Sequence, residues 1–294
     1  MVKRIIYSNT SFIFTKKMEM CEGKTLSKKK HKAMSLSEKI RRAVMILMAF
    51  IAVGSLGYFA YYNYQASHTE QEFSQLAELK DKDIVVNPDR FFTRPEEEAA
   101  PNILNDYKAL YNKNKSLIGW LKIDDTNIDY PVMQSKNEEY YLEHDFDQNY
   151  DKNGTLFISA DAKIWPRSQN IIVFGHNMKS GKMFGSLSQY KNSNYYEKHK
   201  QIQFDTLYEK GTYEVMYVFL SRVYDEAEVT FKYYQFIDAI SEEEFNSHME
   251  DMKNMSLYDT GVTAAFGDQL LTLSTCDHDT ADAERFVVVA KRIQ

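Results

Sequence analysis

The chain has 294 residues, of which 44% are hydrophobic and 27% are charged. This balance supplies enough apolar side chains for a packed core and excludes wholesale disorder. Glycine and proline, with 11 and 5 residues, are too scarce for a collagen-like or low-complexity chain. Roughly 100–200 residues per domain allows one or two domains. The 21 Tyr, 18 Phe and 2 Trp residues favour a β-rich domain, because aromatic side chains fit the pleated surface of a sheet.

The net charge of −6 conceals an uneven distribution along the chain. Residues 1–42 carry 12 Lys and Arg against 3 Asp and Glu, whereas the remaining residues carry 24 basic and 39 acidic side chains. An acidic body without a basic stripe lacks the clustered cations that contacts with phosphates need. We therefore expect no nucleic-acid partner.

An uncharged apolar segment, residues 43–62, lies at the boundary between the two charge blocks. About 20 apolar residues at 1.5 Å each cross the ~30 Å hydrocarbon core of a bilayer, which predicts a transmembrane helix. Lys39, Arg41 and Arg42 precede the segment, and the next basic residue is Lys80. The positive-inside rule then predicts a cytoplasmic N-terminus and an extracellular chain after the helix.

Two other interpretations of this segment stay open, a buried core helix and a cleaved signal peptide. A core helix usually offers only about 10–14 apolar residues. The apolar region of a signal peptide runs about 7–15 residues and ends in an A-x-A-like site, which Gln65-Ala66-Ser67 matches poorly. An uncleaved anchor is favoured, and Met34 is an alternative start of the chain.

The sequence after the anchor divides into a stalk and a folded domain. Residues 63–102 are polar, with a helical stretch near Glu70–Leu79, and the boundary follows the proline-flanked acidic run Pro95–Pro101. The domain over residues 103–294 is predicted to be mostly β. Strands are expected at 119–123, 128–132, 155–159, 170–174, 201–207, 212–220, 269–275 and 285–292, and helices at 103–117, 138–144 and 241–255. About seven or eight short strands predict a closed or nearly closed β-barrel.

The two cysteines lie on opposite sides of the predicted membrane. Cys21 would be cytoplasmic and Cys276 extracellular, so they cannot form a disulfide within one chain. A lone exported thiol is either a reactive group or an inert, buried small hydrophobe. The residue type alone leaves both alternatives open.

A strand is predicted to end at Cys276 and another to begin at Arg285. If these strands pair antiparallel, both residues lie at the same edge of the sheet. A guanidinium beside a thiol favours the thiolate, which is the nucleophilic form. The alternative for Arg285 is a surface arginine paired with a carboxylate.

A thiol nucleophile usually needs a base, and histidine is the common choice. His176 follows the predicted strand 170–174 after a glycine, which places it at the rim of a barrel. His278 is only two residues from Cys276 and is the weaker candidate; the absence of a catalytic histidine is the third alternative. No His/Cys cluster has zinc spacing, and the calcium-like loop starting at Asn149 lacks the required Glu at its twelfth position, so we expect no metal and no cofactor.

Together these motifs resemble those of a known family. The run Thr272–Cys276 followed by Arg285 is similar to the TLxTC…R signature of sortases, and residues 170–178 are similar to their strand-then-Gly-His segment. The resemblance covers roughly residues 103–294. Residues 118–132, the run Glu139–Phe146 and the 221–268 stretch resemble the N-terminal portion and the insertion of class B sortases.

The resemblance implies a closed sortase-type barrel with N-terminal helices and a helix-containing insertion before the cysteine strand. It also implies a membrane-anchored cysteine transpeptidase on a Gram-positive-type cell. Cys276 would attack the threonine carbonyl of a C-terminal sorting signal of the Asn/Ser-Pro-x-Thr-(Asn/Gly/Ser) kind. His176 would act as acid and base, Arg285 would hold the substrate or the oxyanion, and Ser274 and Thr275 would bind substrate.

The implied partners are secreted proteins that carry this signal and an amine of a cell-wall peptide or its lipid-linked precursor. A pilin-polymerising sortase, which uses a protein lysine as acceptor, keeps the same three residues and remains an alternative. A catalytically inactive, membrane-anchored binding module is a third possibility, against which the intact Cys/His/Arg set argues.

Overall fold

The computed structural model describes residues 35–80, 100–137, 139–276 and 284–294. Three sequence predictions lie outside these ranges: those for residues 1–34, for His278 and for most of the Pro95–Pro101 boundary. Only the last two residues of that boundary are described. The chain forms two compact units, Met1–Ser55 and Leu56–Gln294. Helix α1 (Leu36–Lys80) begins in the first unit and continues into the second.

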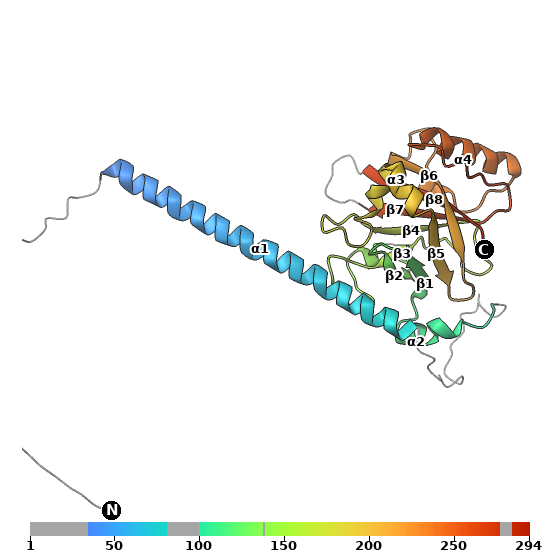
Figure 1. Cartoon of the computed structure of the whole chain (residues 1–294), viewed down its shortest axis with the longest axis horizontal. Helices are drawn as coiled ribbons and strands as arrows, with labels where there is room; N and C mark the ends of the chain where they lie inside the picture. The colour runs from blue at the N-terminus through green and yellow to red at the C-terminus, as the bar shows by residue number, and fades with distance from the viewer. Residues whose placement is uncertain (1–34, 81–99, 138, 277–283) are drawn as a thin grey trace, which may run out of the picture. The chain divides into compact units, whose positions relative to one another are not determined.

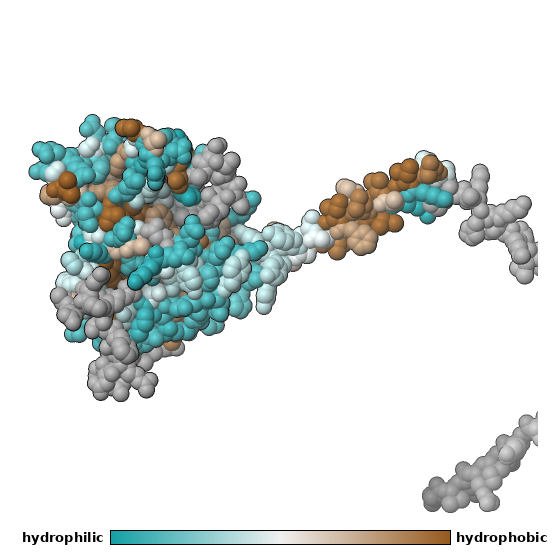
Figure 2. All heavy atoms as spheres, turned by 180° about the vertical axis from the view of Figure 1, so that it is seen from behind, coloured by the Kyte–Doolittle hydropathy of each residue, from teal (hydrophilic) through white to brown (hydrophobic). Residues whose placement is uncertain are grey.

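Helix α1 joins two segments that the sequence suggested separately, the apolar span and the helical stretch near Glu70–Leu79. Its first part carries large apolar side chains that are more than half exposed, among them Phe50, Leu56 and Phe59. Figure 2 shows hydrophobic residues gathered over this part of the helix. Among the described residues α1 is the one helix long and apolar enough to cross a membrane.

The second unit is built on eight strands that form a closed ring, as predicted (Figure 1). The strands are β1 (Leu117–Lys122), β2 (Asp129–Gln134), β3 (Leu156–Ile158), β4 (Asn170–His176), β5 (Gln201–Thr206), β6 (Thr212–Arg222), β7 (Leu270–Cys276) and β8 (Glu284–Arg292). Their order around the ring is β1-β2-β3-β4-β7-β8-β6-β5, and β1 pairs with β5 to close it. The pairs β2–β3 and β4–β7 are parallel and the other pairs antiparallel.

Alternation along the strands separates two hydrophobic cores. Leu271 and Leu273 of β7 point into the main core, which fills the ring. Leu270 of β7 and Val287 of β8 point to the opposite face and join a second core. This second core lies under the segment between β6 and β7, which includes the 3₁₀ helix η5 (Tyr233–Gln235) and helix α4 (Glu242–Met255).

The predicted helix over 241–255 is confirmed as α4, and its start follows from capping. Ser241 is the N-cap, and its hydroxyl accepts a hydrogen bond from the amide of Glu244. The Glu244 carboxylate accepts in turn from the amide of Ile240. Phe245, Met249 and Met252 repeat at helical spacing and bury one face of α4 in the second core.

Two predicted elements differ from the structure, and two helical elements were not predicted. The helix expected over 103–117 is the shorter α2 (Asn105–Lys113), because the Asn114 side chain bonds the amide of Ser116 and the carbonyl of Phe146 and so turns the chain into β1. The helix expected over 138–144 is a 3₁₀ turn, η3 (Tyr140–Leu142). The sequence analysis gave no element to η4 (Leu187–Lys191) and α3 (Ser193–Lys198), which bury Leu187 and Tyr196.

A buried asparagine fastens β4 to β7 and to the insertion. Asn170, at the start of β4, accepts from the Thr272 hydroxyl at 2.9 Å and donates to the Phe236 carbonyl at 2.8 Å. Its side chain is 1% exposed. Without this side chain, the Thr272 hydroxyl and the Phe236 carbonyl would be buried and would lack a hydrogen-bond partner.

We expect Asn170→Ala to lower the free energy of unfolding by about 2–4 kcal/mol, since each buried group left unpaired costs about 1–3 kcal/mol. Urea denaturation followed by tryptophan fluorescence measures this, because both tryptophans, Trp120 and Trp165, belong to the second unit. The exposed Asn102→Ala is the control and should change stability by less than ~0.5 kcal/mol. Equal stability of the two variants would contradict this role.

Candidate active site

Two parallel strands bring the predicted base and nucleophile to one place. β4 and β7 pair in register through seven consecutive residue pairs, from Asn170 with Leu270 to His176 with Cys276. Paired residues of a parallel ladder share a face of the sheet, and neighbouring strands lie about 4.8 Å apart. His176 and Cys276 are therefore adjacent positions at the carboxyl ends of adjacent strands.

Arg285 reaches the same place from the other side of β7. β7 and β8 pair antiparallel, which meets the condition set in the sequence argument, and the last pair of this ladder is Ser274 with Val287. Two residues further along each strand lie Cys276 and Arg285. On its other side β8 pairs with β6, where Ser221 is the partner of Arg285. The registers thus align Ser221, Arg285, Cys276 and His176 across β6, β8, β7 and β4.

In this row Ser221, Arg285 and His176 lie on the outer face of the ring, toward the insertion between β6 and β7. Leu270 and Val287, at even spacing from Cys276 and Arg285, belong to the second core under that insertion. Tyr233 of η5 reaches the same face, where its hydroxyl lies 2.7 Å from the Ser274 hydroxyl. The insertion therefore forms one wall beside the row.

The two predicted substrate-binding residues both have internal partners. Ser274 is 0% exposed and bonds Tyr233. Thr275 is 1% exposed, and its hydroxyl accepts a hydrogen bond from the amide of Phe286 at 2.9 Å. This bond lies one residue beyond the last β7–β8 pair, Ser274 with Val287, so Thr275 fixes the backbone next to Arg285.

The His176 ring is half-buried, and one of its nitrogens is bound. Nε2 lies 2.7 Å from the carbonyl oxygen of Leu142, which precedes β3 in the chain. A carbonyl oxygen can only accept, so Nε2 carries the proton of this bond. Nδ1 is then the ring atom whose protonation distinguishes the neutral from the charged imidazole.

The other described histidines beyond the span are engaged elsewhere. His144 stacks on Tyr140, and His199 stacks on Tyr195. His68 lies beside Glu72, and His248 packs against Phe236. His278 lies outside the described residues. Among the described residues no group of three or more His, Cys, Asp or Glu side chains is placed to hold a metal.

Ser221 is the one member of the row that the sequence analysis missed. It is 8% exposed, and its hydroxyl has no hydrogen-bond partner among the described residues. Only the β6–β8 register places it beside Arg285. No local sequence signal carries that information, because the two residues are 64 positions apart in the chain.

The chain is similar to proteins of one family. The model of the sortase domain matches residues 121–293. Sortase B of Staphylococcus aureus is 30% identical over 189 residues, which cover 64% of this chain and 75% of that protein. Sortase B of Listeria monocytogenes is 32% identical over 178 residues, which cover 60% of this chain and 68% of that protein.

Solved structures agree with these matches. Sortase B of Bacillus anthracis in complex with AAEK1 has a TM-score of 0.65 and 28% identity, and the match covers 79% of this chain and 99% of that one. The Staphylococcus aureus sortase B–substrate complex has a TM-score of 0.66 and 25% identity, with the same coverage of both chains.

We expect Thr275→Val to lower the free energy of unfolding by about 1–3 kcal/mol, because it leaves the buried amide of Phe286 without an acceptor. Thr275→Ser keeps the hydroxyl and should retain most of the stability. The measurement is the same fluorescence-detected denaturation. A Thr275→Val protein as stable as the parent would show that the Phe286 amide does not depend on this side chain.

Proposed function

Because this chain belongs to the sortase family and is a cysteine transpeptidase, we propose that Cys276, His176 and Arg285 are its catalytic residues. The single observation that carries this assignment is the shared register of β4, β7 and β8, which gathers the three positions at one edge of the ring. These are also the positions that match the family motifs in the sequence.

In the proposed reaction the Cys276 thiolate attacks the carbonyl carbon of a threonine in the sorting signal. The carbon–nitrogen bond of the following peptide unit breaks, and Nδ1 of His176 protonates the departing amine. The remaining acyl group is held as a thioester. An incoming amine then gives a proton to His176 and attacks the thioester, which releases the Cys276 thiolate and forms the new amide.

Arg285 is proposed to stabilise the carbonyl oxygen while it carries negative charge. A guanidinium presents several N–H donors in a fixed plane, which suits an oxyanion better than the mobile point charge of lysine. Ser274 is proposed to exchange its bond with Tyr233 for one to the substrate. Thr275 is proposed to hold the backbone beside Arg285 in place.

The proposed organisation keeps the enzyme at the cell surface. Residues 1–42 form a basic cytoplasmic segment, 43–62 the membrane span, 63–102 the extracellular linker and 103–294 the catalytic domain. The helical part of the linker packs against the barrel through Phe73 and Leu76. The basic residues before the span support this orientation. The exposed apolar side chains of the first part of α1 support membrane insertion.

The substrates proposed here are secreted proteins with a C-terminal sorting signal of the class B kind. The similarity to two sortase B proteins supports this class. The acceptor is proposed to be an amine of a cell-wall peptide or its lipid-linked precursor. Supplying a glycine-peptide amine and a lysine-containing peptide in parallel separates wall anchoring from pilin polymerisation.

The test uses the full chain in detergent micelles with quenched peptides of the Asn/Ser-Pro-x-Thr-(Asn/Gly/Ser) kind. The parent should cleave one of these peptides and join it to an added amine. Cys276→Ala should reduce cleavage below detection, because no thioester can form, whereas Cys21→Ala should cleave like the parent. Persistent turnover by Cys276→Ala would eliminate the covalent mechanism.

We expect Arg285→Lys to lower kcat/KM by about 10²–10³-fold, the usual cost of losing one well-aimed oxyanion donor. The matched control is Arg292→Lys at the far end of β8, where the guanidinium binds Glu209 and Gln269. The control should stay within about threefold of the parent, since it is remote from the row. Comparable rates for the two variants would mean that the charge of residue 285, and not its donor geometry, is what matters.

A further inference from the structure

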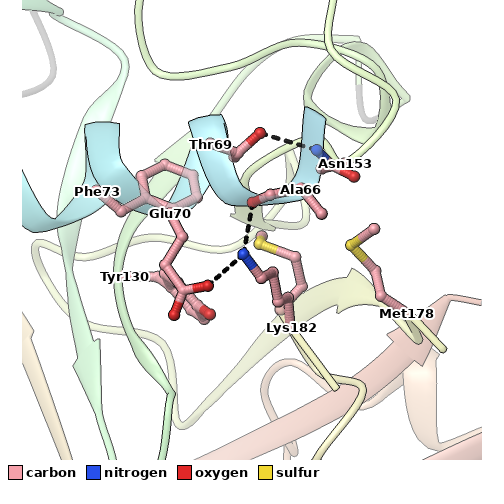
Figure 3. Close-up of a pocket in the computed structure, with 9 residues that line it drawn as sticks. Ala66, Thr69, Glu70, Phe73, Tyr130, Asn153, Met178 and Lys182 are labelled. Atoms are coloured by element: carbon pink, nitrogen blue, oxygen red, sulfur yellow. Dashed lines mark hydrogen bonds and ion pairs between the residues drawn. The ribbon is translucent and has the colours of Figure 1, made fainter. Parts of the chain in front are cut away.

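The C-terminal part of α1 is packed into the same unit as the barrel. Phe73 and Leu76 are each 3% exposed and belong to the main core. Phe73 meets the ring of Tyr130 edge-on, with centroids 5.2 Å apart. The polar sequence of this segment predicts a stalk, but Phe73 and Leu76 are part of the folded unit. Figure 3 shows it lying against two loops of the barrel.

The first loop is a turn held by Thr69. This residue is 4% exposed, and its hydroxyl accepts from the Asn153 side-chain amide at 2.8 Å. The hydroxyl has two possible acceptors for its own proton, a carboxylate oxygen of Asp151 at 2.5 Å and the Gln65 carbonyl at 3.1 Å. The shorter contact is the one to Asp151. Asp151 also accepts from the Asn153 backbone amide, which closes the turn. Thr69 therefore ties α1 to both arms of this turn.

The same turn supports the carbonyl that binds His176. Gly154 follows Asn153 with a φ of +60°, and a Cβ there would lie 2.5 Å from the carbonyl oxygens of Tyr141 and Leu142. The next amide, of Thr155, donates to the Tyr141 carbonyl at 2.8 Å. The turn thus packs directly on the peptide group whose oxygen receives the Nε2 proton of His176.

The second loop follows His176 itself. Lys182 forms an ion pair with Glu70 at 2.5 Å and donates to the Ala66 carbonyl at 2.7 Å, as the dashed lines in Figure 3 show. Two residues later, the amide of Phe184 donates to the His176 carbonyl at 3.0 Å. One turn of α1 therefore holds a loop that fixes the ring of His176 and a loop that fixes its backbone.

We propose that Thr69 is a positioning residue for His176, and that Glu70 acts in the same way through Lys182. The proposal rests on the proposed role of His176 as the acid and base. Thr69 touches no reacting atom. It sets the place of the Leu142 carbonyl, which in turn holds the proton of the neutral ring on Nε2. α1 thereby carries both the apolar span and part of the support of the active site.

The test compares Thr69→Val, which keeps the shape but removes the hydroxyl, with Thr69→Ser, which keeps the hydroxyl. The full chain is assayed in micelles at a temperature well below each variant's own unfolding midpoint. We expect Thr69→Val to lose about 5- to 30-fold in kcat with little change in KM. A misplacement of about 1 Å can cost about 10²-fold, and the shift expected here is smaller because the Thr155 amide still binds the neighbouring Tyr141 carbonyl. Thr69→Ser should recover most of the activity. Ser74→Ala, an exposed hydroxyl on the same helix, is the matched control.

A spectroscopic readout keeps this test independent of turnover. In ¹⁵N-histidine-labelled protein, with His176 identified by its loss in His176→Gln, the parent should show the Nε2-protonated ring. Thr69→Val should shift that ring toward a mixture of tautomers, while Thr69→Ser should resemble the parent. If the parent cleaves no peptide, the proposed function fails, but the spectra still decide the role of Thr69.

Glu70→Gln is a second variant for the case in which Thr69→Val does not fold. Glu70 is partly exposed, so losing its ion pair with Lys182 should lower the stability of the protein only slightly. We expect about a 2- to 5-fold loss of kcat, with the exposed Glu78→Gln as control. If Thr69→Val folds, the proposal is supported when this variant shows both a lower kcat and an altered His176 ring. If Thr69→Val does not fold, the proposal is supported when Glu70→Gln shows the lower kcat. A kcat within twofold of the parent, or an unchanged His176 spectrum, would overturn the proposal.

Discussion

The in-register pairing of β4 with β7 is the constraint on which the rest of the site depends. These strands are separated by 93 residues in the sequence but run parallel for seven residue pairs, ending at His176 and Cys276. A slip of one residue would turn one of the two side chains to the other face of the ring. Two buried features hold the register: the inward row of Val173 and Leu273, and the hydrogen bond between Asn170 and Thr272.

The surrounding structure supports this edge from two sides. The insertion between β6 and β7 covers the outer face and contributes Tyr233, which bonds Ser274 in the cysteine strand. The C-terminal part of α1 holds the loops before β3 and after β4, which carry the contacts to the ring and backbone of His176. Chemistry at the end of a strand therefore depends on segments far away in the sequence. This explains why a barrel alone does not define the site.

Local patterns predicted what depends on neighbouring residues. The capping motif at Ser241 marked the start of α4, and the short alternating runs marked the strands of the ring. The antiparallel pairing of β7 and β8 was also accessible, since only a short connection separates Cys276 from Arg285. The exit from the strand after Gly175 already favoured His176 over His278, and the family resemblance strengthened that choice. The chemical role of His176 is a proposal.

Long-range arrangement could not be predicted from the same patterns. Nothing near Ser221 indicates that it lies opposite Arg285, because the β6–β8 register is set by packing over the whole strand. Thr69 lies in a polar segment that looks like a stalk, and its burial depends on loops more than 80 residues away. The segment Tyr140–Leu142 forms a 3₁₀ turn instead of the longer helix expected from its sequence. Its hydrogen bonds depend on the loop that packs on it, and that loop lies farther along the chain.

Disulfide trapping tests the central claim, the register of β4 against β7, most directly. In a Cys21→Ala background, His176→Cys places a second thiol opposite Cys276, at the ~4.8 Å strand spacing that a disulfide can bridge. Phe174→Cys is the matched control, because it lies opposite Ser274 and one full strand repeat away from Cys276. The account predicts that mild oxidation forms the intramolecular disulfide in His176→Cys and not in Phe174→Cys, as read by intact mass and thiol counting. A disulfide in Phe174→Cys, with free thiols in His176→Cys, would contradict it.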